Sequence, residues 1–197
     1  MNQNLEEILK ICTSLRDEER YVLGIDGLSR SGKTTLVNRL RHRLEKMNVT
    51  IYVIHIDDHI VERAKRYNTG QEAWSEYFHL QWDVNSLRDQ LFSKLKSNKS
   101  LILPIYHEEL DSVTLQTINL PHKCLILIEG VFLQRCEWRS FYDYMIYLDC
   151  SREKRFQRES DFSRKQIKKF RERYWKAETY YMETAMPIEN ANLVLKG

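Results

Sequence analysis

The sequence predicts an α/β fold of three layers, in which a five-stranded parallel sheet carries helices on both faces. Short apolar runs of strand length recur along the chain, and segments with the apolar spacing of amphipathic helices separate them. Because a helix between consecutive strands makes a crossover connection, the strands run parallel and both faces of the sheet are covered. Ligands of such sheets bind beyond the carboxyl ends of the strands, so we expect the functional residues there.

The predicted strands of the sheet are rich in Val, Ile and Leu. They cover residues 21–25, 49–56, 123–130, 144–149 and 192–196. Short, nearly continuous apolar runs of this kind are typical of buried parallel strands. Two further short strands, 101–106 and 113–120, are expected outside the sheet, and they predict a small hairpin on the substrate side.

Apolar residues at helical spacing predict the remaining elements. Helices are expected over residues 3–18, from 33 to about 47, from 84 to 95, over 152–158 and over 163–183. Residues 60–82 are expected to form short helices over the edge of the sheet. Residues 152–165 are expected to form a small lid, within a single domain that spans residues 1–197 and begins with the 1–18 helix.

The composition is that of an ordinary globular protein. Hydrophobic residues make up 42% and charged residues 30% of the 197-residue chain, which is long enough to bury a full core. No apolar run reaches the roughly 18 residues that a membrane span needs, and no secretory signal is visible. The cysteines are scattered, as expected of reduced thiols. We expect a cytoplasmic protein without a membrane partner, and the sequence leaves open whether it forms a homo-oligomer.

Basic residues crowd the segment 152–176, so nucleic-acid binding has to be weighed. The net charge of +3 is too small to indicate a nucleic-acid partner. An apolar stripe at heptad-like spacing also makes most of the later charges the solvated back of a packed helix. The stripe consists of Ile167, Phe170, Tyr174, Ala177 and Tyr181. The pattern favours a small-molecule substrate.

A glycine-rich loop follows the first predicted strand and opens the next helix. Residues 27–34 follow the pattern G-x-x-x-x-G-K-T, the signature of a phosphate-binding loop. Its glycines let successive N–H groups point at phosphate oxygens, and the helix N-terminus adds its own. Lys33 can reach the β- and γ-phosphates, and the Thr34 hydroxyl can hold Mg²⁺. The residues expected to bind ATP are Gly27, Ser29, Arg30, Ser31, Gly32, Lys33, Thr34 and Thr35.

Acidic residues end two other predicted strands. Asp57 can face the loop and accept the proton of a hydroxyl group, although a carboxylate that merely solvates a strand end is the alternative. Glu129 can hold Mg²⁺ together with Thr34, with the same alternative. His55 and His59 frame Asp57, but their spacing and the lack of a further His/Cys cluster argue against a zinc site.

Three more residues are candidates by position. Arg155 and Arg158 share one face of the basic helix after the fourth strand, where a lid can clamp the transferred phosphoryl group. Asp83 stands where a helix N-cap is expected, and this interpretation stays open beside a role in substrate binding.

Taken in order, these segments resemble the uridine kinase-like branch of P-loop kinases, from Tyr21 to the end of the chain. That branch includes uridine-cytidine kinases, nicotinamide riboside kinases, phosphoribulokinase and bacterial pantothenate kinase. Besides the loop, the similar segments are Val53-Ile54-His55-Ile56-Asp57-Asp58, Leu80-Gln81-Trp82-Asp83, Pro104-Ile105-Tyr106, Ile126-Leu127-Ile128-Glu129-Gly130 and the last predicted strand.

The resemblance implies a P-loop NTPase fold and phosphoryl transfer from ATP, with Mg²⁺, to an alcohol such as a nucleoside or ribosyl compound. Within it, Asp57 corresponds to the family's catalytic base and Glu129 to its acidic Mg²⁺ partner. Asp83 corresponds to the residue that binds ribose hydroxyls, and Tyr106 lies at the start of the base-recognition hairpin. Arg155 and Arg158 fall where the lid arginines lie.

The chain departs from uridine kinases around the acceptor. Asp58-His59-Ile60 replaces an aromatic pair that follows the base, and Glu108 and Asp111 replace the aromatic residue and His that read the pyrimidine. Three basic residues nearby could bind an anionic group, as a kinase of a sugar phosphate would need, or could be surface charge. They are Arg63, Lys65 and Arg66.

Two alternative functions remain open from the sequence. One is a kinase of a sugar phosphate or a pantothenate-like alcohol. The other is a nucleotide-dependent regulatory or binding protein without small-molecule kinase activity, although the N-K-x-D and D-x-x-G motifs of GTPases are absent from the sequence.

Overall fold

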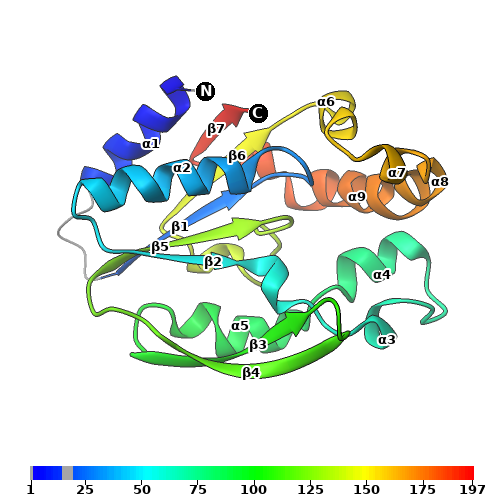
Figure 1. Ribbon diagram of the computed structural model, residues 1–197, viewed down its shortest axis with the longest axis horizontal. Helices are drawn as coiled ribbons and strands as arrows, with labels where there is room; N and C mark the ends of the chain where they lie inside the picture. The colour runs from blue at the N-terminus through cyan, green and yellow to red at the C-terminus, as the bar shows by residue number, and fades with distance from the viewer. Residues whose placement is uncertain (1, 15–19) are drawn as a thin grey trace.

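The structure is a computed structural model that describes residues 2–14 and 20–197. Its main sheet has five strands in the order β2-β5-β1-β6-β7, and every neighbouring pair is parallel (Figure 1). The strands are β1 (Arg20–Asp26), β2 (Ile51–His55), β5 (Cys124–Gly130), β6 (Tyr144–Asp149) and β7 (Leu193–Lys196). The predicted five-stranded parallel sheet is confirmed.

One face of the sheet is covered by α1 (Asn2–Ser14) and α2 (Lys33–Lys46). The apolar residues of α2 recur every three to four positions, so they form one stripe toward the sheet. That stripe packs on Leu23 and Ile25 of β1, whose neighbours in the strand point to the opposite face. The first predicted helix ends at Ser14 in the described part, and residues 15–18 of that prediction lie outside the described residues.

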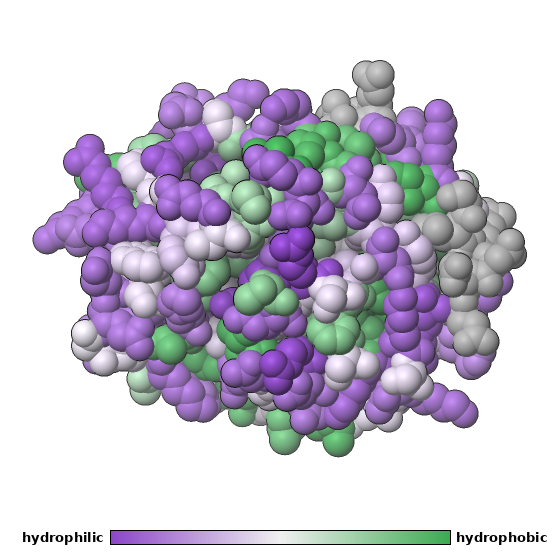
Figure 2. All heavy atoms as spheres, turned by 180° about the vertical axis from the view of Figure 1, so that it is seen from behind, coloured by the Kyte–Doolittle hydropathy of each residue, from purple (hydrophilic) through white to green (hydrophobic). Residues whose placement is uncertain are grey.

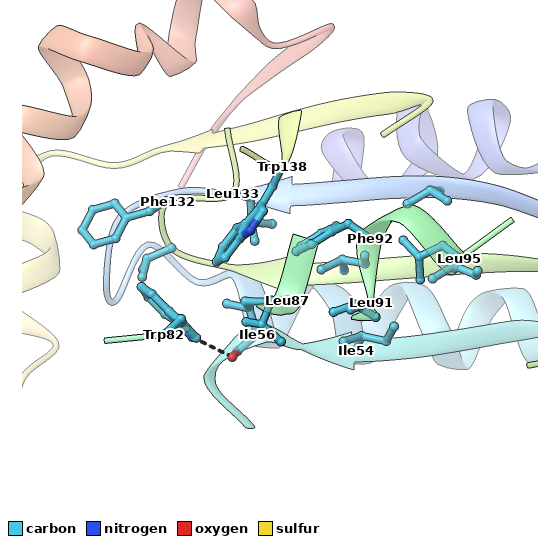
Figure 3. Packing of buried hydrophobic residues seen from close by; sticks show 14 of the residues in the cluster. Ile54, Ile56, Trp82, Leu87, Leu91, Phe92, Leu95, Phe132, Leu133 and Trp138 are labelled. Carbon is cyan, nitrogen blue, oxygen red and sulfur yellow. Dashed lines mark hydrogen bonds between the residues drawn. The ribbon is translucent and has the colours of Figure 1, made fainter. Parts of the chain in front are cut away.

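The other face carries a larger and more aromatic core. It packs on Val22, Ile126 and Ile128 of the sheet and is covered by α4 (Ala73–His79), α5 (Val84–Gln90) and α9 (Trp175–Ala185). Trp82 and Trp138 are almost fully buried in it, and the indole N–H of Trp82 donates to the carbonyl of Ile56 at 2.9 Å (Figure 3). Helices on both faces complete the predicted three layers.

A two-stranded antiparallel hairpin lies outside the main sheet, below it in Figure 1. It consists of β3 (Ser100–His107) and β4 (Ser112–Asn119). Leu101 and Leu103 of β3 are buried in the aromatic core, whereas Ile102 between them is 61% exposed. The predicted small hairpin is confirmed.

Short helical segments connect these elements. They are η1 (Ile56–His59), α3 (Arg63–Arg66), η2 (Phe92–Lys94), η3 (Arg139–Phe141) and α10 (Pro187–Asn190). The predicted 84–95 helix is therefore interrupted, since the 3₁₀ turn η2 follows α5. Residues 60–82 form short helices, as expected, with α3 and α4 in that stretch.

The prediction of one long helix over residues 163–183 is wrong. After α6 (Arg152–Gln157) the chain forms α7 (Asp161–Arg164), α8 (Ile167–Lys169), a π-helical segment η4 (Phe170–Tyr174) and then α9. The ψ angle of 40° at Gln166 breaks the helical hydrogen-bond ladder. The apolar stripe begins only at Ile167, after the break, and it runs without interruption through η4, so the π-helical segment leaves no mark on the sequence pattern.

The surface is largely hydrophilic. Figure 2 shows the side opposite to Figure 1, where hydrophilic side chains cover most of the face and hydrophobic ones form smaller groups. Most basic residues of the C-terminal helices are exposed, while Ala177 and Tyr181 of their apolar stripe are buried, which confirms the predicted solvated back. Arg155 and Arg173 are exceptions, since they are buried against Glu178 and Glu76. In residues 2–14 and 20–197, no helix combines the length and apolarity needed to cross a bilayer.

Candidate active site

The loop between β1 and α2 has the geometry of a phosphate cradle. Gly27 and Gly32 have φ angles of 152° and 103°, which residues with a Cβ rarely adopt. A Cβ at Gly27 would also lie 2.8 Å from the carbonyl oxygen of Leu148. No side chain caps the first amides of α2, and the buried Ser31 hydroxyl has no hydrogen-bond partner among the described residues. These donors fit an anionic ligand at the start of the helix.

A lysine and two oxygen ligands stand next to the cradle. Lys33 is buried, and its Nζ donates to the carbonyl oxygen of Leu28 at 3.1 Å. The Thr34 hydroxyl donates to Oε1 of Glu129 at 3.0 Å, and Nδ1 of His55 lies 2.7 Å from the same oxygen. A hydroxyl and a carboxylate are hard oxygen donors of the kind that Mg²⁺ prefers, so this pair fits the ion.

The electrostatics of this pair favour an ionised carboxylate. Burial pushes the pKa of Glu129 upward, but the hydrogen bond from His55 and the charge of Lys33 outweigh it and bring the pKa below its ordinary value. The same hydrogen bond raises the pKa of His55. Burial lowers the pKa of Lys33, against the pull of Glu129, Asp26 and Asp57. A charged group bound at this place therefore enters a site with little water to screen it.

Asp57 lies in η1, directly beyond the carboxyl end of β2. Its side chain is open to the cleft but surrounded by protein atoms, and this desolvation raises the pKa of its carboxyl above the ordinary value, against the opposing charge of Lys33. A carboxylate with a raised pKa is a better proton acceptor near neutral pH than a fully solvated one. The position and the pKa together suit a general base.

One cleft of about 1130 Å³ joins these groups. Of the predicted ATP-binding residues, Ser29, Arg30, Gly32, Lys33, Thr34 and Thr35 line it, while Gly27 and Ser31 shape the loop from behind. The other predicted residues that line it are Asp57, Glu129, Tyr106, Arg155 and Arg158. The structure thus brings together, around one space, nearly all of the residues that the sequence singled out.

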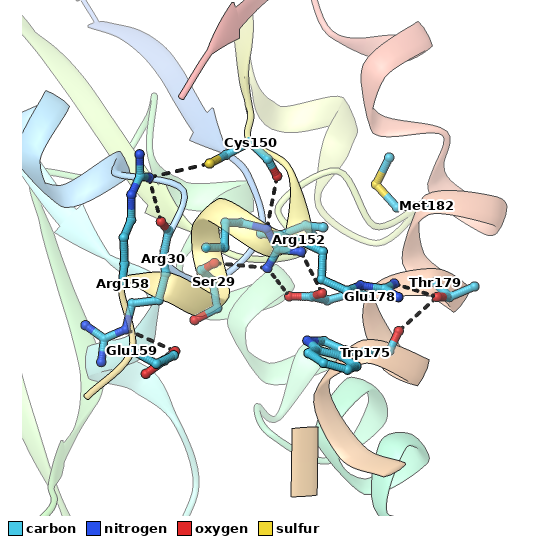
Figure 4. A network of polar contacts seen from close by, with 12 residues as sticks. Ser29, Arg30, Cys150, Arg152, Arg158, Glu159, Trp175, Glu178, Thr179 and Met182 are labelled. Carbon is cyan, nitrogen blue, oxygen red and sulfur yellow. Dashed lines mark hydrogen bonds and ion pairs between the residues drawn. The ribbon is translucent and has the colours of Figure 1, made fainter. Parts of the chain in front are cut away.

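The two arginines of the predicted lid contact the loop, and Figure 4 shows Arg158 beside Arg30. Their role as a clamp on the phosphoryl group stays a prediction. Arg155 is buried and makes a two-point ion pair with Glu178, with contacts of 2.7 and 2.9 Å. It also donates to the carbonyl oxygen of Ser29 at 3.1 Å. Arg158 donates to the carbonyl oxygen of Arg30 at 2.9 Å. Both side chains therefore hold the backbone of the cradle.

Residues 22–165 match the sequence profile of the Phosphoribulokinase / Uridine kinase family. The chain belongs to this family. It is also similar to uridine kinases of Staphylococcus aureus, with 29% identity over 129 residues, or 65% of this chain and 61% of that of strain JH9. The match thus spans less than two thirds of those relatives' length.

Two solved structures have a fold similar to that of this chain. A possible uridine kinase from Bacillus stearothermophilus is 48% identical, covers 98% of both chains and superposes with a TM-score of 0.88. A D-glycerate 3-kinase from Cryptococcus neoformans shares the fold, with a TM-score of 0.66 at 14% identity over 99% of this chain and 94% of that one.

In this family member, Asp83 lies outside the large cleft. Its carboxylate caps α5 by accepting a hydrogen bond from the Ser86 amide at 3.0 Å, so the predicted helix N-cap is confirmed. Asp83 lines a separate groove between α5 and the hairpin. The structure does not bring it together with Asp57 and the loop, and its role toward ribose stays a prediction.

The two histidines that frame Asp57 do not share a metal site. His55 bonds to Glu129, whereas Nδ1 of His59 lies 2.7 Å from the carbonyl oxygen of Pro104 and the side chain is buried under the hairpin. Nowhere in the described part of the chain do three or more His, Cys, Asp or Glu side chains gather as metal ligands would.

Several residues of the kinase cleft were missed by the sequence analysis. Gln81, Tyr67, Tyr77, Tyr174 and Lys169 all line it. They come from three different segments whose apolar spacing indicates only packing, and their approach to the cleft depends on how α4 and the C-terminal helices fold over the sheet. His55 carried a signal, since it directly precedes the strand end, but its partner Glu129 is 74 residues away.

Proposed function

We propose that the chain transfers the γ-phosphoryl group of ATP, with Mg²⁺, to a hydroxyl group of a small molecule, a nucleoside or other ribosyl compound. The observation that carries the proposal is the shared cleft, in which Asp57 faces a glycine-shaped phosphate cradle beside Lys33 and the Thr34–Glu129 pair. Membership of a kinase family and the similarity to uridine kinases support the same reaction.

Each residue has a distinct task in this proposal. The amides of the loop and Lys33 bind the phosphates, and Thr34 and Glu129 would hold Mg²⁺, which draws charge from the phosphate oxygens when bound. Asp57 takes the proton of the acceptor hydroxyl. The acceptor oxygen then forms a bond to the γ-phosphorus while the bond to the β,γ-bridging oxygen breaks, so ADP leaves and a phosphate ester remains. Positioning and electrostatics supply the rate, because little covalent chemistry is asked of the protein.

The proposal is tested by ATP consumption in the presence of candidate acceptors. The panel contains uridine, cytidine, nicotinamide riboside, pantothenate and pentose phosphates, each with and without Mg²⁺. We expect ADP formation that depends on one acceptor class and on Mg²⁺. Slow hydrolysis of ATP that no alcohol in the panel accelerates would contradict the proposal and favour a regulatory nucleotide-binding protein.

A further inference from the structure

A buried arginine lies in the cleft away from the phosphate cradle. Arg66 ends the short helix α3, is only 5% exposed and lines the same cleft as Asp57. Its Nη1 donates to Oε1 of Gln81 at 3.4 Å. The residue after Gln81, Trp82, donates to the carbonyl of Ile56, which directly precedes Asp57. Arg66 and Asp57 therefore belong to neighbouring parts of one cleft wall.

All of the hydrogen-bond acceptors of the Arg66 guanidinium are neutral. Its Nε donates to the carbonyl oxygen of Val61 at 2.8 Å, and its Nη2 donates to the Tyr106 hydroxyl at 3.2 Å. The guanidinium also lies over the rings of Tyr67 and Tyr106, at 5.0 and 5.3 Å. Among the described residues, no carboxylate oxygen lies within 4.0 Å of it. The nearest acidic side chain along this network, Asp111, accepts a hydrogen bond from the Tyr106 hydroxyl, and the charges of Arg63 and Arg66 help to lower the pKa of Asp111.

Other buried arginines near the cleft are paired. Arg155 contacts Glu178 at 2.7 Å, and Arg173 contacts Glu76 at 3.0 Å, in each case with both side chains almost fully buried. Burying a charge without a counter-charge is costly, which is why buried charges are normally paired or bind a ligand. Arg66, by contrast, has no directly paired carboxylate among the described residues, so its charge is available to an anionic ligand in the cleft.

A purely structural role for Arg66 can be compared with that of Arg20, which is also buried and whose guanidinium bonds only to backbone carbonyl oxygens. Arg20 donates four such bonds, and it does not line the cleft. Arg66 makes three bonds, one of them as long as 3.4 Å, and keeps part of its five-donor fork free. Exposed Arg63 adds a second positive charge to the same part of the cleft.

We propose that the acceptor alcohol carries an anionic group, a carboxylate or a phosphate, which Arg66 binds while Asp57 takes the proton from the hydroxyl. This inference rests on the proposed function and restricts its acceptor to charged members of the class. A guanidinium fork matches the paired oxygens of both anions. The anionic group takes no part in bond making, so its effect is on acceptor binding and selectivity.

The test compares matched pairs of probes that differ in the anionic group. Ribose 5-phosphate is compared with D-ribose, and glycerate with glycerol, by titration calorimetry on the full chain with Mg²⁺ and a non-hydrolysable ATP analogue. We expect at least one anionic probe to bind more tightly than its neutral partner. We expect Arg66→Gln to weaken that binding by about tenfold or more, since it removes hydrogen bonds to a charged group. Tighter binding of ribose 5-phosphate than of D-ribose indicates a phosphate, and tighter binding of glycerate than of glycerol indicates a carboxylate.

Lys65→Gln is the matched control, because it removes the same charge one residue away, where the side chain is 66% exposed, pairs with Glu62 and does not line the cleft. It should leave acceptor binding unchanged. Arg66→Lys keeps the charge but not the fork and should give an intermediate affinity. Unchanged binding of the ATP analogue shows that each variant is folded.

Three results would overturn the inference while the ATP analogue still binds. They are equal binding of neutral and anionic probes, binding of an anionic probe that Arg66→Gln does not weaken, and binding of none of the anionic probes. Failure of the wild-type chain to bind the ATP analogue would instead contradict the proposed function itself, and the inference with it.

Discussion

At the residue scale, the site depends on how a few charged side chains set one another's pKa. Desolvation is the strongest influence on Asp57, and it raises the pKa of its carboxyl group. The negative charges of Glu129 and Asp58 raise this pKa further. The positive charges of Lys33 and His55 lower it. The net effect is a carboxyl group with a raised pKa. His55 stays protonated to a higher pH than an ordinary imidazole because of its 2.7 Å contact with Glu129.

We predict that His55→Gln moves the acid limb of the pH profile of kcat/KM to higher pH. Asp57 must be ionised to accept a proton, so activity is lost as the pH falls through its pKa. Removing the positive charge of His55 removes an interaction that lowers this pKa. The exposed His42 belongs to α2 but does not line the cleft, and it provides the control His42→Gln, whose profile should match the wild type. An acid limb that stays in place or moves to lower pH would refute the role of His55.

Some individual residues were predictable and others were not. Gly27, Gly32, Lys33 and Thr34 follow from the motif alone, because phosphate binding at a strand-to-helix turn requires those residue types in that order. The bond between Thr34 and Glu129 could be anticipated only as a helix start and a strand end that meet beyond the sheet. Asp83 shows the limit, since the same residue type suits both a helix cap and a sugar ligand, and only the structure shows which contact it makes.

At the scale of the elements, α6 is fastened to the phosphate cradle. Arg155 and Arg158 of this segment bind the carbonyl oxygens of Ser29 and Arg30, and Glu159 contacts the Arg30 side chain at 3.1 Å (Figure 4). The buried Arg155–Glu178 pair then joins the same segment to α9. The predicted lid of residues 152–165 thus begins with a helix that is anchored on both sides.

We predict that breaking this anchor destabilises the protein. Glu178→Gln leaves the buried guanidinium of Arg155 without its counter-charge and should lower the free energy of unfolding by about 3–5 kcal/mol, as measured by urea denaturation. The double variant Arg155→Met/Glu178→Leu should lose less free energy of unfolding than Glu178→Gln, because it leaves no unpaired charge buried. Glu45→Gln breaks the exposed Arg41–Glu45 pair of α2 and should cost about 0.5 kcal/mol or less. Equal losses in Glu178→Gln and Glu45→Gln would show that the buried pair anchors nothing.

Element boundaries were predictable where one periodicity ends and another begins. The strands and α2 match the expected ranges closely. A strand that is buried on both faces has a continuous apolar run in its sequence, and a helix that is buried on one face has apolar residues at helical spacing. The π-helical segment η4 and the 3₁₀ turn after α5 were not predictable, because the apolar spacing runs through both. Tertiary packing determines where a helix is interrupted, and the tertiary contacts cannot be read from a single sequence.

At the scale of the whole molecule, the fold places the reaction by its strand order. β1 lies at the centre of the sheet, between β5 and β6, so the loop after it is flanked by the ends of its neighbours. Glu129 comes from β5, and Asp57 follows β2, the next strand outward. Residues far apart in the sequence therefore meet at one edge of the sheet (Figure 1). This convergence was predictable from the α/β pattern, whereas the part of the cleft lined by α3, α4 and the hairpin was not.

The most direct test of the account is the turnover of Asp57→Asn with the acceptor found by the panel of alcohols. Removing the base should lower kcat by about 100-fold or more, while the affinity for an ATP analogue stays unchanged, because the cradle and the Thr34–Glu129 pair are untouched. Asp58→Asn, the same change one residue along, should keep nearly all of the turnover. Turnover of Asp57→Asn close to that of the wild type would contradict the claim that this carboxylate takes the acceptor's proton at the phosphate cradle.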